Sequence, residues 1–275
     1  MADSARVAGG ASPTGSVTFT LFAPGDATCA TPIATRTNTL TGNTAASGNI
    51  PVSAAGTYSW VATYSGDANN SPATSPCGSE TVLVTAQTLT GRAYGVSASA
   101  TLLGIPLLTV VPTPDTGFVS TASSSTTSTP CVAVLGGAVS AHALCANVTT
   151  VANPARSTAS ASVADTTAAI LGIPTVTMRL VQSTSTTTCA GSTGATTIAF
   201  LSVGGVVVIA QPTQIAPSTG VTVGVVTLVL NEQLPFTGAD RGLTVNAVHA
   251  RVNTLGLASV DLVVASSQSD IVNCP

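Results

Sequence analysis

The sequence predicts an all-β fold, and three observations support this prediction. Short runs rich in Val, Thr and Ala recur along all 275 residues, with Gly, Pro, Asn and Asp between them. No stretch has apolar residues at helical spacing over three turns. Charged residues make up only 6% of the chain and mean hydropathy is +0.50, a composition unlike that of disordered chains. We expect an N-terminal β-sandwich followed by a larger β-sandwich or flattened barrel.

The N-terminal part contains the clearest alternation of strands and turns. Residues 1–15 precede the first strand pattern and are expected to be flexible, and they could act as a donor strand in a neighbouring subunit. Residues 16–87 are predicted to form the first sandwich. In this region the strand patterns SVTFTLF, TYSWVATY and SETVLVTA alternate with the turn signals PGD, TGN, AAG and SGDANN.

Longer strands are predicted beyond a short linker at residues 88–92. The second domain, residues 93–275, contains apolar runs such as TIAFLSVGGVVVIA and VTVGVVTLVL. The string LGIP occurs twice, at Leu103–Pro106 and Leu171–Pro174, which is typical of a duplicated strand-turn-strand unit.

Two Ser/Thr tracts interrupt the second domain. Residues 120–130 and 182–188 lack the alternation of a buried strand. We expect them to be loops or exposed edge strands.

The cysteines indicate the compartment in which the protein folds. Six of them are scattered without a CxxC pair, at Cys29, Cys77, Cys131, Cys145, Cys189 and Cys274. An even, scattered set predicts disulfides and an oxidising compartment. No signal peptide is evident, so we expect the chain to be a mature secreted fragment. The most apolar run, residues 198–210, is shorter than the roughly 20 residues of a membrane helix. We expect an extracellular or cell-wall location and no transmembrane segment.

The scarcity of basic residues makes binding to anionic partners unfavourable. The chain has seven Arg, no Lys and ten acidic residues, with a formal net charge of -3. Nucleic-acid and anionic-membrane binding both need clustered basic residues. We therefore expect neither partner, and no motif calls for a cofactor.

A resemblance to a known family lies in GTYSWVATYSGDANNSPAT, where alternating aromatic residues precede a Gly-Asp turn. This segment resembles the bacterial Ig-like repeats of large surface proteins, over about Ser16–Val84. The resemblance implies an Ig-like sandwich with Tyr58 in a tyrosine corner and Trp60 in the core. Cys29 and Cys77 then fall in loops of one small domain and are expected to pair.

The same turn offers weak calcium candidates in Asp67, Asn69 and Asn70. Calcium binds loop oxygens, but Asp26 is the nearest other acid, so carboxylates are few. A turn in which Asx side chains bond their own backbone is the favoured interpretation, and no metal is expected.

The second domain resembles another family. Strings such as CVAVLGGAVSAHALCANVTT, LTVNAVHARV and SDIVNC are similar to the choice-of-anchor P family, found on secreted proteins of high-GC bacteria. The resemblance spans about residues 93–274 and implies an extracellular domain without enzymatic activity.

The four cysteines of this domain allow two arrangements. Cys131 and Cys145 flank a hairpin with a Gly-Gly turn signal and could face each other, which leaves Cys189 to pair with Cys274. A Cys131–Cys189 bond is the rival arrangement.

Several catalytic motifs are incomplete. LPFTG at Leu234–Gly238 matches a sortase signal but continues into a strand pattern. Asp115-Thr116-Gly117 has no second such tripeptide to supply the paired carboxylate of an aspartic protease. His142 and His249 are the only histidines, GxSxG is absent, and His249 lies beside Arg251 in a strand pattern. We expect no enzyme.

These patterns together favour a non-enzymatic extracellular bacterial surface protein with a structural role. Low charge and long strands without lysine predict self-association into a fibre or layer through unprotected β-edges, or contact with cell-wall components. The alternative is a cell-surface adhesin that binds glycan or protein ligands, with surface Tyr or Trp gripping sugars.

Overall fold

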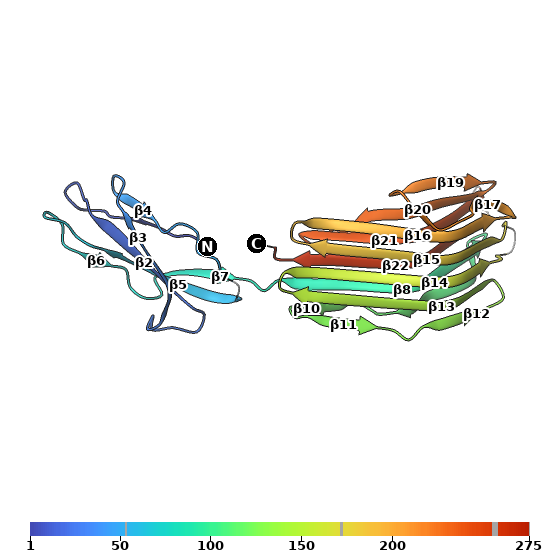
Figure 1. Ribbon diagram of the computed structural model, residues 1–275, viewed down its shortest axis with the longest axis horizontal. Coiled ribbons are helices and arrows are strands. Elements are labelled where there is room, and N and C mark those ends of the chain that lie inside the picture. The colour runs from blue at the N-terminus through green and yellow to red at the C-terminus, as the bar shows by residue number, and fades with distance from the viewer. Residues whose placement is uncertain (53, 171–172, 255–257, 275) are drawn as a thin grey trace. The chain divides into compact units, whose positions relative to one another are not determined.

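The chain forms strands throughout and divides into two compact units. The computed structural model describes residues 1–52, 54–170, 173–254 and 258–274. Over these residues the chain contains no helix, and hence none that could cross a membrane. The all-β prediction is confirmed. The units are Met1–Ala86 and Gln87–Pro275, drawn in Figure 1.

Unit 1 is built on a five-stranded antiparallel sheet. Its order is β3-β2-β5-β6, with β7 also paired to β5. The bounds are β2 (Ser16–Phe22), β3 (Pro32–Thr39), β5 (Gly56–Tyr64), β6 (Ala73–Thr74) and β7 (Glu80–Val84). Alternate residues of β2 and β5, among them Phe19, Leu21 and Trp60, are buried in one core.

The N-terminal segment belongs to unit 1, so the expectation of a flexible donor strand is wrong for its first residues. β1 (Ser4–Arg6) pairs with β4 (Thr44–Ala46) of the same chain. The Met1 ammonium donates to Asn49 Oδ1 at 3.0 Å and to the Ile50 carbonyl at 2.7 Å. The backbone groups of these residues therefore already form hydrogen bonds within their own chain, whereas a donor strand would need them free to pair with a neighbouring subunit.

Unit 2 is a sandwich of two large antiparallel sheets (Figure 1). The seven-stranded sheet has the order β10-β8-β22-β21-β20-β19, with β9 also paired to β8. Its strands are β8 (Thr88–Leu102), β9 (Ile105–Asp115), β10 (Val119–Thr121), β19 (Thr219–Val223), β20 (Val226–Pro235), β21 (Arg241–Thr254) and β22 (Ala258–Val272).

The eight-stranded sheet has the order β11-β13-β14-β15-β16-β17, with β12 on β13 and β18 on β16. Its strands are β11 (Ser125–Ser128), β12 (Val132–Leu135), β13 (Val139–Ala152), β14 (Ala155–Ala168), β15 (Val176–Thr188), β16 (Gly191–Val203), β17 (Val206–Ile209) and β18 (Thr213–Gln214). Aliphatic and small side chains from both sheets form a single core.

The predicted linker at residues 88–92 is instead the first part of β8. It pairs with β22 from Thr88↔Val272 to Arg92↔Gln268. Its sequence looked like a linker because it contains a single large apolar residue, Leu89, which is buried. A Cβ at Gly91 would lie 2.8 Å from Val148 Cγ1, so the two sheets approach too closely there for a side chain.

The Ser/Thr tract at residues 182–188 also differs from expectation, because it lies within β15 in the interior of its sheet. Ser183, Ser185 and Thr187 are buried. Hydrogen bonds across the sandwich make this possible: the Ser185 hydroxyl donates to the Leu243 carbonyl at 2.7 Å, and that of Thr187 to the Ser269 carbonyl at 2.9 Å. In the tract at residues 120–130, β10 and β11 do form short edge strands.

The long strands of unit 2 leave few open edges, contrary to the expectation behind β-edge assembly. The outer strands β10, β11, β12, β17, β18 and β19 are two to five residues long. β9 is longer, but its ladder is interrupted by two register shifts and by Pro106, Pro112 and Pro114. Short strands, bulges and proline are the devices by which natural sheets avoid edge pairing.

Candidate functional site

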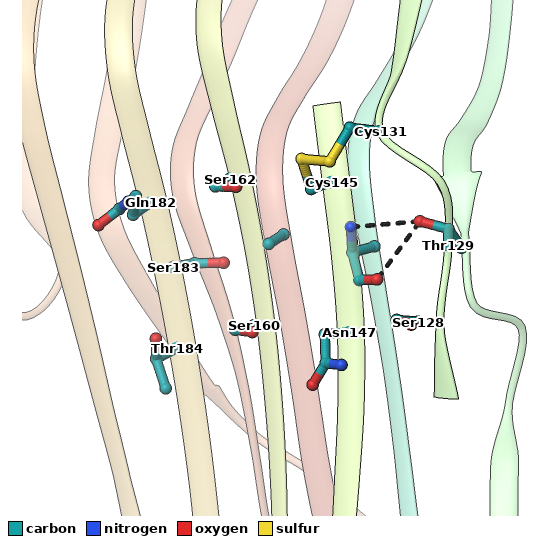
Figure 2. Close-up of a pocket in the computed structure, with 12 residues that line it drawn as sticks. Ser128, Thr129, Cys131, Cys145, Asn147, Ser160, Ser162, Gln182, Ser183 and Thr184 are labelled. Carbon is teal, nitrogen blue, oxygen red and sulfur yellow. Dashed lines mark hydrogen bonds between the residues drawn. A yellow bond between two sulfur atoms is a disulfide. The ribbon is translucent and has the colours of Figure 1, made fainter. Parts of the chain in front are cut away.

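A groove on the outer face of the eight-stranded sheet is the first candidate site in unit 2. Alternate residues of β13, β14 and β15 point outward and form its floor. The register places Asn147, Ser160 and Thr184 in one row. Cys145, Ser162 and Gln182 form the next row, as Figure 2 shows.

The connection from β11 to β12 forms the wall of this groove. Cys131 is bonded to Cys145 of the floor, and the Thr129 amide donates to the Ala146 carbonyl at 3.0 Å. The Thr129 hydroxyl and the Ala146 amide add a 3.3 Å hydrogen bond (Figure 2). The groove encloses about 420 Å³, which is within the range of small-ligand sites.

The lining of the groove is neutral and polar. None of its twelve lining residues is charged or aromatic. Within the described part of the chain, the side chains of Ser160, Ser162, Gln182 and Thr184 make no hydrogen bond to other protein groups. Hydroxyl and amide groups both donate and accept hydrogen bonds, so these four side chains can bind a neutral polar ligand.

A row of threonines continues this hydroxyl surface across five strands. The register aligns Thr126, Thr149, Thr158, Thr186 and Thr193 on β11, β13, β14, β15 and β16. Thr158 and Thr186 bond each other through their hydroxyls at 3.3 Å. The outer face therefore presents hydroxyl groups beyond the groove itself.

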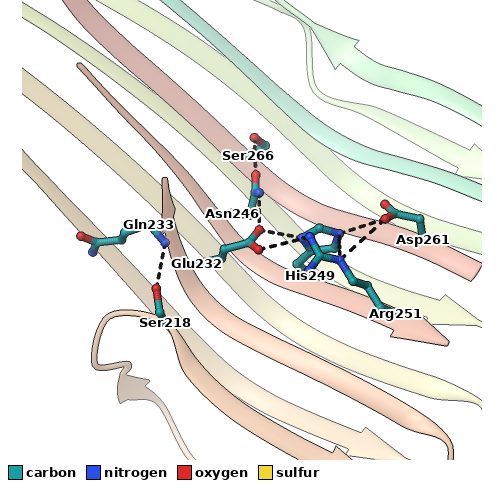
Figure 3. Close-up of polar contacts among 8 residues, drawn as sticks. All are labelled: Ser218, Glu232, Gln233, Asn246, His249, Arg251, Asp261 and Ser266. Carbon is teal, nitrogen blue, oxygen red and sulfur yellow. Dashed lines mark hydrogen bonds and ion pairs between the residues drawn. The ribbon is translucent and has the colours of Figure 1, made fainter. Parts of the chain in front are cut away.

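A charged cluster on the seven-stranded sheet is the second candidate (Figure 3). His249 on β21 lies between two carboxylates: its Nδ1 is 2.6 Å from Glu232 Oε2 on β20, and its Nε2 is 3.1 Å from Asp261 Oδ2 on β22. Arg251 Nη2 is 3.4 Å from Glu232 Oε1. The imidazole and the Glu232 carboxylate are both buried.

Further hydrogen bonds engage the remaining groups of this cluster. Asn246 Nδ2 donates to Glu232 Oε2 at 2.8 Å, and the Ser266 hydroxyl donates to Asn246 Oδ1 at 2.7 Å. Arg251 Nε donates to His249 Nε2 at 3.0 Å. The described contacts of His249 include no hydroxyl or thiol, so the cluster lacks the nucleophile–base pair of a triad. It links β20, β21 and β22.

Sequence reasoning noted His249 and Arg251 but missed their carboxylate partners. The signal that could have found them is strand pairing, because Asp261 lies directly opposite Arg251 in the register. Glu232 was hidden by an irregularity in β20, where Asn231 has a φ of 50°. The pairing of β20 with β21 keeps its register there, but Leu230, Asn231 and Glu232 are buried in succession, so simple alternation fails. His142, the other histidine, lies exposed opposite Asp165.

The Asp-Thr-Gly tripeptide lies where β9 ends, in the connection to β10, and both of these strands pair with β8. Asp115 binds Arg92 through Nη2 at 2.6 Å and Nε at 3.0 Å, and accepts the Gly117 amide at 2.9 Å. The hydrogen bonds from Arg92 lower the pKa of the Asp115 carboxyl. The carboxylate is therefore held in a structural ion pair.

In unit 1, Tyr58 and Trp60 lie in the core. The Tyr58 hydroxyl donates to the Ala54 carbonyl at 2.8 Å, the upstream backbone contact of a tyrosine corner. Trp60 is fully buried and meets Phe19 edge-on, with ring centroids 6.5 Å apart. Tyr64 is buried too, so none of these three rings offers the exposed platform that the adhesin alternative required.

The calcium candidates form a turn that fastens the N-terminal segment. Asp67 accepts hydrogen bonds from the Thr14 amide at 2.6 Å, the Tyr64 hydroxyl at 2.9 Å and the Asn69 amide at 2.8 Å. Asn70 Nδ2 donates to both of its carboxylate oxygens. These donors, the Thr14 amide first, lower the pKa of the Asp67 carboxyl. The arrangement matches the Asx-turn interpretation.

Three disulfides connect the six cysteines. Cys29 is bonded to Cys77, Cys131 to Cys145, and Cys189 to Cys274. The structure thus contains the first of the two arrangements expected for unit 2, and the rival Cys131–Cys189 bond is absent. Three disulfides fit a protein that folds outside the reducing cytoplasm.

Comparison with known proteins does not place the chain in a family. No protein-family model, no curated protein and no solved structure matches it.

Proposed function

We propose that this chain is a non-enzymatic extracellular surface protein with a structural role, built from an Ig-like unit and a choice-of-anchor-like unit. We propose further that it self-associates through one end of unit 2 instead of through strand edges. Support comes from the exposed aliphatic side chains at the end where β8 turns into β9, which we call the far end. In Figure 1 it is the right-hand end of the larger unit.

Eight large aliphatic side chains are exposed on the strands and turns of the far end. They come from four hairpins: Leu102, Leu103, Ile105, Leu107, Leu135, Val206, Val207 and Val225. The far-end stretches 102–107, 132–141, 201–209 and 220–228 contain no charged residue and no histidine. Exposed aliphatic side chains mark an interaction surface where they form one contiguous patch, and we propose that these eight form such a patch.

The absence of charge makes a second copy of the same end a suitable partner. The four hairpins carry no charge that would have to be desolvated when two far ends meet, whereas the exposed Arg251–Asp261 pair beside them, with Arg251 opposite Thr227, must stay solvated at the rim of the contact. Each aliphatic side chain that is buried contributes about 1.5–3 kcal/mol. A self-complementary contact closes to a pair of molecules. A fibre or layer, the extended form of this proposal, requires a second contact elsewhere.

Light scattering coupled to size-exclusion chromatography tests the proposal. We expect the mass of the wild-type protein to rise with concentration and to remain raised at high salt, since apolar contacts are not screened. A Leu103→Asp/Ile105→Asp variant should remain monomeric. Leu83→Asp is the matched control, because Leu83 is an exposed aliphatic residue of unit 1. A wild-type protein that is monomeric at every concentration would refute self-association.

A further inference from the structure

We propose that the groove between β11 and β15 binds a neutral glycan chain through hydroxyl and amide groups alone. This site lies on the outer face of a sheet, apart from the hairpin turns of the far end, and it does not depend on self-association. It differs from the adhesin expected from the sequence, because it uses no aromatic platform.

The first argument is the chemistry of the lining. A glycan chain presents many hydroxyl groups that each donate and accept, and the floor offers the same kinds of group from Ser160, Ser162, Gln182 and Thr184. In the described structure these four side chains have no hydrogen-bond partner in the protein. A ligand can therefore bind them without breaking a protein hydrogen bond.

The second argument is the absence of charge. None of the lining residues carries a charge, and the charges nearest in these strands, Asp165 and Arg179, pair with each other at 3.8 Å. An acidic glycan would find no cationic partner in the groove. A neutral glycan has no charge that must be desolvated.

The third argument is the fixed geometry of the wall. The Cys131–Cys145 disulfide and the hydrogen bonds between Thr129 and Ala146 fasten the wall to the floor. A site held in this way loses little conformational freedom when a ligand binds.

The threonine row suggests how a long chain would lie. Thr149, Thr158 and Thr186 lie one row away from Asn147, Ser160 and Thr184 and on the same face. A glycan chain running across the strands could bind several rows at once. Because each neutral hydrogen bond adds little net free energy, we expect affinity to rise with chain length.

NMR titration of the ¹⁵N-labelled full chain with defined oligosaccharides tests this proposal. The probes are the neutral hexasaccharides cellohexaose, maltohexaose and chitohexaose, the trisaccharide of each, and the anionic hexagalacturonate. We expect at least one neutral hexasaccharide to shift amide signals of residues 145–149, 158–162 and 182–186, and its trisaccharide to bind more weakly. Hexagalacturonate should not bind there.

Variants of two floor residues make the test specific. Ser160→Ala/Gln182→Ala should weaken binding by about tenfold. Thr81→Ala is the matched control, because Thr81 is an exposed residue of β7 in unit 1, and it should leave affinity unchanged. Unshifted floor signals with all three hexasaccharides would overturn the proposal. So would shifts confined to other strands, or equal binding of hexagalacturonate.

Discussion

At the residue scale, unit 2 is unusual in placing hydroxyl groups inside its sandwich. Ser185 and Thr187 bond across to the opposite sheet, whereas the buried Ser183 hydroxyl has no partner among the described residues. A buried polar group stabilises a fold only when it is hydrogen-bonded. We therefore expect the hydroxyl groups of Ser183 and Ser185, two residues apart on β15, to change the free energy of unfolding in opposite directions.

Ser183→Ala and Ser185→Ala form a matched pair that measures this difference. Ser183→Ala should leave the free energy of unfolding unchanged or raise it by up to about 1 kcal/mol, because it removes an unpaired polar group. Ser185→Ala should lower it by about 1–2 kcal/mol, because it leaves the Leu243 carbonyl without its donor. Urea unfolding followed by circular dichroism measures both. Equal losses in the two variants would contradict the assignment.

The charged cluster makes a second prediction at this scale. His249→Ala removes the 2.6 Å partner of the buried Glu232 carboxylate, which keeps Asn246 and Arg251, and should destabilise unit 2 by about 1.5–3 kcal/mol. Arg179→Ala, which breaks the exposed pair with Asp165, should cost less than about 1 kcal/mol. Thermal unfolding of the two variants compares them. A loss in His249→Ala no larger than in Arg179→Ala would show that the cluster is not a stabilising link.

At the scale of elements, covalent and hydrogen-bonded ties hold short segments onto the sheets. The N-terminal segment is fixed by β1 pairing and by the Asp67 turn. Disulfides close the wall of the groove and join Cys189, at the start of the β15–β16 turn, to Cys274, two residues after the end of β22. Each tie can be removed separately.

The Asp67 turn predicts a pH dependence in unit 1. Its carboxyl pKa is lowered in the folded state, so its contribution is fully present above the unfolded pKa of about 3.9 and is lost as pH falls below that value. Trp60 is the only tryptophan, and it lies in unit 1, so its fluorescence follows unfolding of this unit. Stability should fall less steeply below about pH 4 in Asp67→Asn than in the wild type.

A control for this prediction comes from Asp26, whose pKa is also lowered, chiefly by the Thr31 amide. Because Asp26 remains in the Asp67→Asn variant, some acid sensitivity should persist. An Asp67→Asn profile identical to that of the wild type would mean that the turn does not fasten the segment.

The disulfides of unit 2 should differ in their contribution to stability. The Cys189–Cys274 bond spans 85 residues and the Cys131–Cys145 bond spans 14. In the chain-entropy description, removing them costs about 4.5 and about 3 kcal/mol. Denaturation of the two double Cys→Ala variants checks the order. The reverse order would indicate that local structure, and not loop length, dominates.

At the scale of the whole molecule, the sequence was sufficient to predict the class of fold. It was insufficient to predict where the first strand of unit 2 begins and which Ser/Thr tract is buried. Strand alternation and turn residues led to the all-β prediction, and the aromatic pattern around Trp60 correctly indicated a buried position. The linker prediction failed because Gly91 occupies a close sheet contact. The Ser/Thr tract was misplaced because its hydroxyls are satisfied by β22 and β21, strands far away in sequence.

The candidate sites were harder to predict, because they depend on pairing between distant segments. The sequence contains Asn147, Ser160 and Thr184 as polar residues far apart along the chain. Only the pairing of β13, β14 and β15 brings them into one row. The eight aliphatic residues of the far end come from four hairpins whose turns lie at the same end of the unit. Neither feature has a local motif.

Self-association through the far end is the central claim about the whole molecule, and electron microscopy of the purified protein tests it most directly. We predict that wild-type images at high concentration contain joined particles, as pairs or longer arrays, and that Leu103→Asp/Ile105→Asp images contain only separate ones. Wild-type fields of separate single molecules, or joined particles that persist unchanged in the variant, would contradict the claim.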